Sequence, residues 1–299
     1  MDSGLLIAVF ERRRAIGYLG FKNARFGKID AHIATCAFAR STLKKAVEIA
    51  ESKGFELVHS IVDSMWLKKH GATIEDYERV CQKIEDELDF PISFEGRYKW
   101  IVFLNSGVNP HVPVLNRYYG LLEDGTLKIR GIDLRRHDTP EIIRKCQSNM
   151  LAVLSEANNS HEFATLIPKA LKVLEGYASL LRTCKAPLKD LVIKRNLSKM
   201  PNEYTKQVLQ AIAANQLIEE GKKIHAGQHI GYIITRNKSS IPENRALSVE
   251  LADQNTTYDS EAYVKLLLSS AMNLLPPAYH TKSLTAGWSP PATRYIRRG

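Results

Sequence analysis

The stretch from Glu56 to Lys68 constrains the fold most, because a polar pair interrupts a run of strand-forming residues. The residues before the pair are largely β-branched or apolar, and those from Met65 onward also favour an extended chain. The pair itself, Asp63 and Ser64, consists of turn-forming residues. The stretch therefore predicts a β-hairpin with a carboxylate at its tip.

The segments around this hairpin predict the fold class. Apolar residues recur at three- and four-residue steps from Asp30, and Gly54 provides a stop. Thr73 is a candidate N-cap for a second amphipathic helix. Residues 93–104 and 117–134 then show strand patterns, and long helical patterns follow. We expect an α+β protein in which an antiparallel sheet with packed helices precedes a mainly helical domain.

The composition indicates which classes of binding partner the protein could have. The formal net charge is +10, and such an excess of Lys and Arg favours polyanions such as nucleic acid, although many basic proteins bind none. The four cysteines are scattered without metal-ligand spacing, so we expect free thiols rather than a zinc site. No apolar run reaches the roughly 18 residues that a membrane helix needs. We expect a cytoplasmic protein without membrane contact.

An aspartate at a hairpin tip is usually only a turn residue, but four later segments change this reading of Asp63. The segments follow one another along the chain as Glu95–Lys99, Asn116–Tyr118, Arg130–Gly131 and Arg136–Asp138. Their order and spacing, from about Gly17 to about Leu275, resemble the C-terminal part of archaeal-type family B DNA polymerases.

The resemblance implies roles for individual residues. Asp63 matches the second aspartate of the family's Asp-Thr-Asp-Ser hairpin, whereas Ile61 replaces the first. Asp63 and Glu95 would be catalytic and would bind Mg²⁺ in a two-metal site. Nucleotide binding is implied for Tyr18 and Ser64. Neighbouring strand residues face opposite ways, so one of Tyr118 and Tyr119 should be buried, and the resemblance implies that Tyr118 is the one that faces DNA. The residues implied in DNA binding are Lys99, Asn116, Arg117, Tyr118, Arg130 and Arg136.

The resemblance also implies a division of the chain. Residues 1–22 would be a remnant of the fingers helix and turn, 23–112 the C-terminal part of the palm, and 113–280 the thumb. Residues 281–299 would form a flexible tail. The family's other essential aspartate, its triphosphate-gripping fingers residues and its exonuclease lie upstream of the matched region.

We therefore expect the small subunit of a split, archaeal-type DNA-directed DNA polymerase. It would be an enzyme only as a heterodimer with a larger chain that carries the exonuclease, the fingers and the remaining palm. The larger chain would dock on the palm sheet edge and on the apolar stretch Leu5–Val9. Primer-template DNA and dNTPs would be the other partners, and the protein would be associated with the nucleoid. The alternative is a non-catalytic DNA-binding or structural subunit derived from a polymerase.

Overall fold

A computed structural model of the chain describes residues 5–10, 18–21, 23–61, 64–106 and 112–275, with backbone only for 5–10. These residues form two compact units. Unit 1 comprises residues 1–103, 114–129 and 157–163, and unit 2 comprises the remainder. Among the described residues, no helix combines the length and the apolar character that a bilayer crossing requires.

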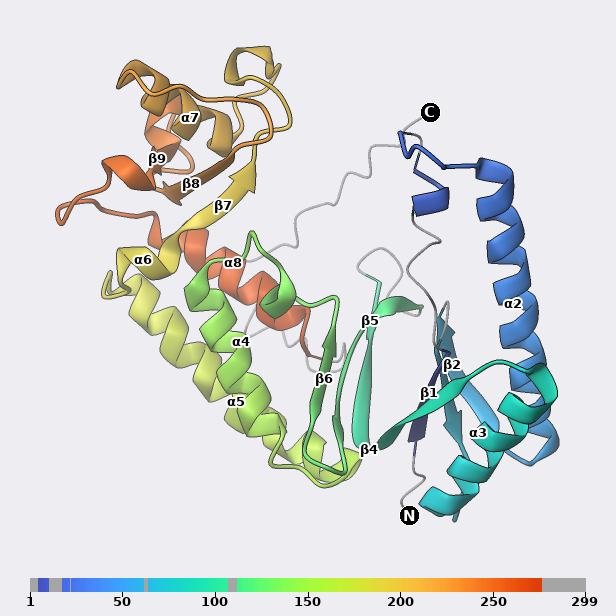
Figure 1. Ribbon diagram of the computed structural model, residues 1–299. Helices are drawn as coiled ribbons and strands as arrows, with labels where there is room; N and C mark the ends of the chain where they lie inside the picture. Colours follow the sequence, from blue (N-terminus) through green and yellow to red (C-terminus); the bar gives the residue numbers. More distant parts are fainter. Residues whose placement is uncertain (1–4, 11–17, 22, 62–63, 107–111, 276–299) are drawn as a thin grey trace. The chain divides into compact units, whose positions relative to one another are not determined.

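Unit 1 is built on a six-stranded sheet with the strand order β2-β3-β1-β4-β5-β6 (Figure 1). The strands are β1 (Leu5–Phe10), β2 (Glu56–Ile61), β3 (Ser64–Lys68), β4 (Ile92–Asn105), β5 (Pro113–Leu122) and β6 (Leu127–Arg130). Strand β1 pairs antiparallel with both β3 and β4, so these two run parallel to each other. They are joined through helix α3 (Ile74–Leu88), because parallel strands of one sheet require a crossover connection.

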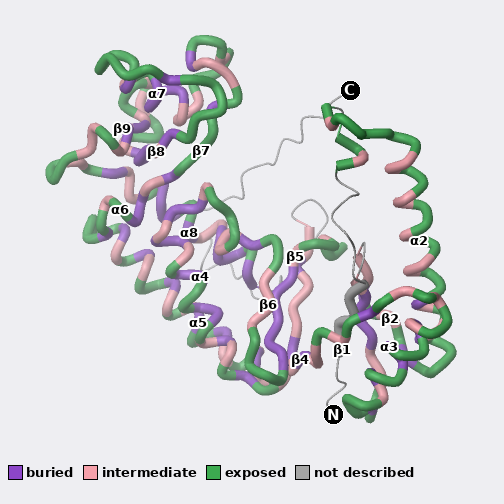
Figure 2. Tube along the Cα trace, in the orientation of Figure 1, coloured by how far each residue is buried: buried purple, intermediate pink, exposed green. Residues whose placement is uncertain are grey.

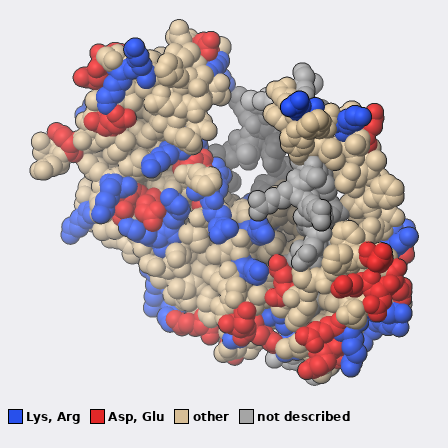
Figure 3. Space-filling view, in the orientation of Figure 1, with Lys and Arg blue, Asp and Glu red and all other residues tan. Residues whose placement is uncertain are grey.

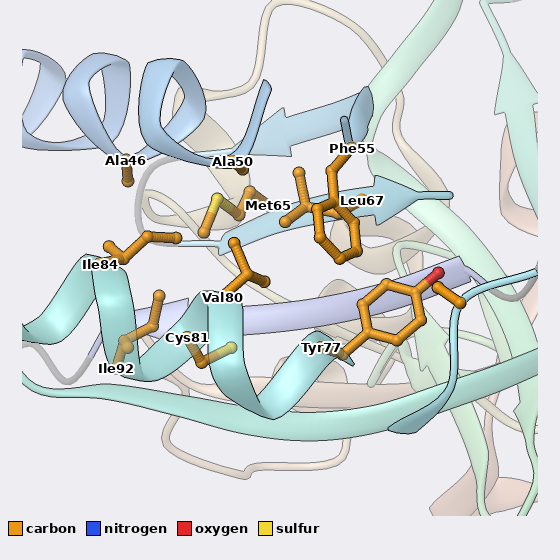
Figure 4. Packing of buried hydrophobic residues seen from close by; sticks show 11 residues of the cluster. Ala46, Ala50, Phe55, Met65, Leu67, Tyr77, Val80, Cys81, Ile84 and Ile92 are labelled. Atoms are coloured by element: carbon orange, nitrogen blue, oxygen red, sulfur yellow. The ribbon is translucent and has the colours of Figure 1, made fainter. Parts of the chain in front are cut away.

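Helix α3 and helix α2 (Ile29–Ser52) pack on one face of this sheet. Figure 4 shows the core between them, in which Ala46 and Ala50 of α2 meet Met65 of β3. Apolar residues of α3 fill the rest of this core: Tyr77, Val80, Cys81 and Ile84. The periodicity in the sequence is therefore confirmed, because the apolar stripe of each helix faces the strands.

The opposite face of the strands carries an aromatic cluster. Trp66, between two residues that face the helical core, points to this side and packs against Tyr118 with ring centroids 5.1 Å apart. His59 lies 4.9 Å from the Trp66 ring, and its Nε2 is 2.9 Å from the carbonyl oxygen of Leu115. Side chains alternate between the two faces of a strand, which explains this division of β3.

Strand β1 corrects two expectations from the sequence. Residues 1–22 were expected to be a remnant of a helix, yet Leu5–Phe10 is a strand. The stretch Leu5–Val9 was expected to be a docking surface, yet its backbone pairs with β3 on one side and β4 on the other. An apolar run of six residues fits a strand as well as a helix, and periodicity alone does not separate the two.

Unit 2 contains most of the remaining helices and a three-stranded sheet with the order β7-β8-β9. Its elements are α4 (Glu141–Leu154), α5 (Ser160–Arg182), α6 (Leu188–Leu191), β7 (Ile193–Asn196), α7 (Leu209–Glu219), β8 (His229–Ile234), β9 (Ala246–Ser248) and α8 (Ser260–Met272). The first residues of α5 belong to unit 1, and the helix belongs to unit 2 from Ala164 onward. The Tyr263 hydroxyl of α8 donates to the carbonyl oxygen of Leu191 and accepts from the amide of Ile234. A buried side chain thus links the helices to the sheet.

The α+β class is confirmed, since a sheet with packed helices precedes a largely helical part. The expected boundary at residue 113 differs from the division into units, because Val114–Ile129 belongs to unit 1. These residues contain most of β5 and β6, which are bonded into the large sheet. The assignment of palm and thumb to the two parts stays a prediction.

Candidate functional site

The predicted hairpin is present. Strands β2 and β3 are joined by two residues, and Ile61 pairs with Ser64 at the closed end. Residues 62 and 63, with the candidate Asp63, form this connection and lie outside the described residues. Ser64 also pairs with Val9 of β1, so the hairpin end is tied to the centre of the sheet. Ser64, which the sequence was expected to place in the turn, is instead the first residue of β3.

Glu95, the second candidate, sits on a β-bulge. Ile7 and Ala8 of β1 pair with Gly96 and Phe94, and Glu95 between them has no partner residue in the register. An extra residue reverses the facing of the strand beyond it. Phe94 accordingly packs in the helical core, whereas Tyr98, four residues on, belongs to the aromatic cluster on the other face.

Gly96 makes the bulge possible. Its φ angle is +142°, which disfavours any residue with a Cβ atom. The space around it would admit a Cβ, which would make ordinary contact with the Leu122 side chain at 3.4 Å, so the φ angle is what calls for glycine. The Glu-Gly pair of the sequence motif thus has a structural reason, since glycine lets the strand re-aim the glutamate.

The Glu95 carboxylate is partly exposed and already faces a cation. Its Oε2 lies 3.4 Å from Nζ of Lys128 on β6. The side chains of Glu95 and Lys128 retain about a third of their exposed surface, so this pair contributes little to stability. Both side chains remain accessible to solvent, so each could form an ion pair with a different partner.

Glu95 and the hairpin tip lie on strands that flank β1. Ser64 of β3 and Ser93 of β4 pair with the same residue, Val9. Neighbouring strands are about 4.8 Å apart, so the backbones of β3 and β4 are separated by about 10 Å. A cation shared between these two strands would have to lie over β1.

The described residues do not make up a magnesium site by themselves. Hard oxygen ligands suit Mg²⁺, and Glu95 provides such a ligand. The part of the chain that the structure describes contains no group of three His, Cys, Asp or Glu side chains placed to hold a metal ion. A site with Asp63 and Glu95 would need further ligands.

The expectation that Tyr118 is free to meet DNA is wrong for this structure. Tyr118 is 7% exposed and Tyr119 is fully buried. They do lie on opposite faces of β5, Tyr118 against Trp66 and Tyr119 against Trp100. Both faces of the sheet are covered at this point, which sequence alternation alone could not reveal.

The other residues expected to bind DNA or nucleotide are spread over both units. Lys99 Nζ lies 3.4 Å from Oδ1 of Asn158, while Asn116 and Arg130 are exposed. Arg117 is half-buried and Ser64 is half-buried at the hairpin. Tyr18 is 47% exposed in a turn that precedes α2. The structure brings Ser64 into one sheet with Glu95, whereas Arg130 and Arg136 belong to unit 2.

Arg136 belongs to a charged cluster in unit 2. Its guanidinium donates two hydrogen bonds to Asp138, at 3.0 and 2.9 Å, and Arg195 of β7 lies 3.5 Å from the same carboxylate. These bonds from Arg136 lower the pKa of Asp138. The cluster borders a cavity of about 250 Å³. Sequence reasoning missed Arg195, because no local pattern links it to Asp138.

Charge is unevenly distributed over unit 1. Acidic side chains gather over α3 (Figure 3), a helix with six acidic and two basic residues. Phosphate backbones are repelled by such a surface. Any nucleic acid would therefore avoid the α3 face of unit 1.

Comparison with known proteins agrees with this architecture. The model of the family described as DNA polymerase family B matches residues 17–278. The DNA polymerase of Archaeoglobus fulgidus is 30% identical over 238 residues, which are 79% of this chain and 28% of that protein. DNA polymerase 2 of Aeropyrum pernix is 25% identical over 300 residues, which are 97% of this chain and 35% of that protein.

A solved structure is similar as well. The family B DNA polymerase from the hyperthermophilic archaeon Pyrobaculum calidifontis matches with a TM-score of 0.60 and 27% identity, over 86% of this chain and 31% of that one. The chain thus spans about a third of the length of these relatives. The match of the family over most of the sequence shows that this chain belongs to DNA polymerase family B.

Proposed function

We propose that the chain is the palm and thumb portion of a split DNA-directed DNA polymerase, active in nucleotidyl transfer only with a larger chain. The observation that carries the proposal is the match to the polymerase family over residues 17–278. In the proposal, the exonuclease and fingers belong to the larger chain. Primer-template DNA and dNTPs would be the substrates.

In this proposal Asp63 and Glu95 hold Mg²⁺ together with carboxylates of the larger chain. Two divalent ions would activate the primer hydroxyl and clamp the triphosphate. The chain's own residues would position these carboxylates, Asp63 through the bonded hairpin and Glu95 through the bulge at Gly96. Acidic residues of the larger chain would have to approach over β1, or β1 would have to give up its place between β3 and β4.

Contacts to DNA would come from basic residues outside the α3 face. These side chains would contact the phosphate backbone of DNA, which positions a duplex without reading its sequence. They are Lys99, Asn116, Arg117, Arg130 and Arg136. Tyr18 and Ser64 would meet the nucleotide. Tyr118 would support the hairpin from behind through Trp66, because both rings are buried.

The substitution Asp63→Ala tests the proposal. In the complex with the larger chain, it should lower the rate of nucleotide addition by several orders of magnitude and leave DNA affinity nearly unchanged, as the loss of a transition-state ligand does. Primer extension and fluorescence anisotropy measure the two quantities. Asp124→Ala is the control, because Asp124 also lies at a hairpin turn, between β5 and β6. If the complex with Asp63→Ala extended primers at the wild-type rate, the proposal would be wrong.

A second candidate is a non-catalytic DNA-binding subunit derived from a polymerase. Two observations favour it: β1 carries no acidic residue and fills the sheet between β3 and β4, and Glu95 is paired with Lys128. This candidate predicts that Asp63→Ala leaves the activity of the assembled complex intact. The same primer-extension measurement thus separates the two.

A further inference from the structure

A cavity of about 250 Å³ lies within unit 2, lined by residues from the start of α4, the C-terminal part of α8 and the strand β7. Figure 1 shows these three elements close together, and Figure 2 shows buried stretches in α4 and α8. The volume is below the roughly 300–1,000 Å³ of pockets for drug-sized ligands, so the cavity suits a small group. We name it the α4 cavity, and its lining includes Arg136, Asp138, Thr139, Arg195, Ser269 and Ser270.

Two guanidinium groups reach this cavity from different segments of the chain. Arg136 precedes α4 and donates two hydrogen bonds to Asp138, which leaves most of its five N–H donors for another partner. Arg195 of β7 lies 3.5 Å from Asp138, which is longer than a hydrogen bond between two charged groups. The two arginine side chains are 57% and 50% exposed, so a ligand can reach them from solvent.

The first turn of α4 adds amide donors. The first N–H groups of a helix have no partner within the helix, and they carry a partial positive charge. Among the described residues, no side chain caps this end of α4, and Thr139, Pro140 and Ile143 line the cavity. The charged residues of the described lining are two arginines and two aspartates, so the helix end tips the balance toward an anion.

A buried hydroxyl of α8 points to a missing ligand. Ser270 lines the cavity and is 3% exposed, and its Oγ makes no hydrogen bond to any described residue. Its carbonyl oxygen accepts a hydrogen bond from the side chain of Gln147, so the hydroxyl alone is unsatisfied. Buried polar groups without a partner are rare in folded proteins. A ligand in the cavity would accept the hydrogen bond that the Ser270 hydroxyl lacks.

These donors indicate the chemistry of the ligand. Guanidinium groups and the amides of a helix N-terminus both bind phosphate oxygens, which accept several hydrogen bonds at once. A divalent cation is disfavoured, because both carboxylates of the lining, Asp133 and Asp138, already face Arg136.

We infer that the α4 cavity binds a phosphate group through Arg136, Arg195, the first turn of α4 and the Ser270 hydroxyl. The phosphate belongs either to the backbone of DNA or to a free phosphate in solution, and the chemistry of the site is the same for both. The inference does not depend on a larger polymerase chain, because every group that it names lies in unit 2.

Titration with inorganic phosphate tests the site directly. The full wild-type chain should bind inorganic phosphate in isothermal titration calorimetry. Arg195→Gln should weaken this binding about tenfold, as the loss of a hydrogen bond between charged groups does. Arg182→Gln is the matched control, because Arg182 also belongs to unit 2, is 56% exposed and pairs with an acidic residue, Glu261. Its phosphate binding should equal that of the wild type.

Ser270→Ala separates a contact with the ligand from a structural role. Removal of an unpartnered buried hydroxyl should not lower the free energy of unfolding, which urea unfolding measures. Phosphate binding should nevertheless weaken about fivefold, because one hydrogen bond to the ligand is lost. This variant keeps the test decisive if Arg195→Gln does not fold.

A duplex oligonucleotide tests whether the phosphate comes from DNA. Each phosphate that a protein neutralises contributes about 0.9 to the slope of log affinity against log salt concentration. If Arg136 and Arg195 hold the same phosphate, the variant with both Arg136→Gln and Arg195→Gln should lose about 0.9 of this slope, and not twice as much. Fluorescence anisotropy at several salt concentrations measures the slope, with Arg182→Gln again as the control.

The outcomes also identify the source of the phosphate. A reduced slope with DNA assigns the site to the DNA backbone. Weaker binding of inorganic phosphate by Arg195→Gln and Ser270→Ala, with an unchanged slope, assigns it to a free phosphate. If neither quantity responds to these substitutions, the arginines only form an ion network with Asp138 and the inference is wrong. The proposed polymerase function would then still stand, because Asp63→Ala tests it separately.

Discussion

Gly120 shows how tightly single residues are constrained in the large sheet. A Cβ at this position would lie 2.8 Å from the Trp100 carbonyl oxygen and 2.9 Å from the Tyr98 ring. Real Cβ atoms essentially never approach backbone atoms so closely. The Tyr98 ring and the Trp100 carbonyl are therefore packed directly against the backbone of Gly120.

We expect Gly120→Ala to lower the free energy of unfolding by about 1–3 kcal/mol, because overpacking forces backbone and ring to shift. Gly176→Ala is the control, since nothing lies within 4 Å of a Cβ at this position of helix α5. It should be neutral or stabilising by up to about 1 kcal/mol, because alanine is the better helix former. Urea unfolding measures both, and equal stabilities of the two variants would contradict the packing.

Asp138 gives a prediction about pH. Hydrogen bonds from Arg136 lower its pKa in the folded chain, and Arg195 adds to the effect. A carboxylate whose pKa is depressed by folding stabilises the protein above the unfolded value, near 3.9, and loses this contribution as the pH falls through its folded pKa. Asp138→Asn should therefore be less stable than wild type at neutral pH, with a difference that shrinks below about pH 4. Urea unfolding across this range checks it, and a difference independent of pH would argue against the cluster.

At the scale of helices and strands, the sequence predicted those elements whose capping residues or pairing partners lie close by in the chain. Helix α3 begins with Thr73, whose side chain accepts from the amide of Asp76 while the Asp76 carboxylate accepts from the amide of Thr73. The hairpin of β2 and β3 was equally predictable, because its two strands are adjacent in sequence. The strand β1 was not, because its partners follow it by more than fifty residues.

We expect Thr73→Ala to destabilise unit 1 by about 1 kcal/mol, the usual contribution of a threonine N-cap. Thr73→Ser should restore most of the loss, because a serine hydroxyl accepts the same hydrogen bond. Thermal unfolding followed by circular dichroism measures the series. If serine were as destabilising as alanine, the loss would come from the threonine methyl group and not from the cap.

The candidate site was less predictable than the elements that carry it. The sequence located Asp63 at a hairpin connection and Glu95 on a strand, which follows from turn and strand chemistry. The bulge that re-aims Glu95, the burial of Tyr118 and the pairing of Arg195 with Asp138 all depend on neighbours distant in sequence. No pattern within a single segment reports such contacts.

At the scale of the whole molecule, charge sets the response to salt. The net charge of +10 supports binding to duplex DNA through phosphates, and each neutralised phosphate releases counterions. We expect the DNA affinity of the full chain to fall steeply with salt, by a factor of about 10³ or more between roughly 50 and 200 mM if six or more phosphates are contacted. Fluorescence anisotropy titrations measure it. A salt-independent affinity would exclude this mode of binding.

The place of β1 has a consequence for how the protein is made. During synthesis the first strand leaves the ribosome before either of the strands that hold it, and the last of these, β4, follows α2 and α3. Strand β1 can therefore pair with β3 first, and its pairing with β4 has to wait for residues more than eighty positions later in the chain. Amide exchange pulsed during refolding should accordingly protect β2 before β1.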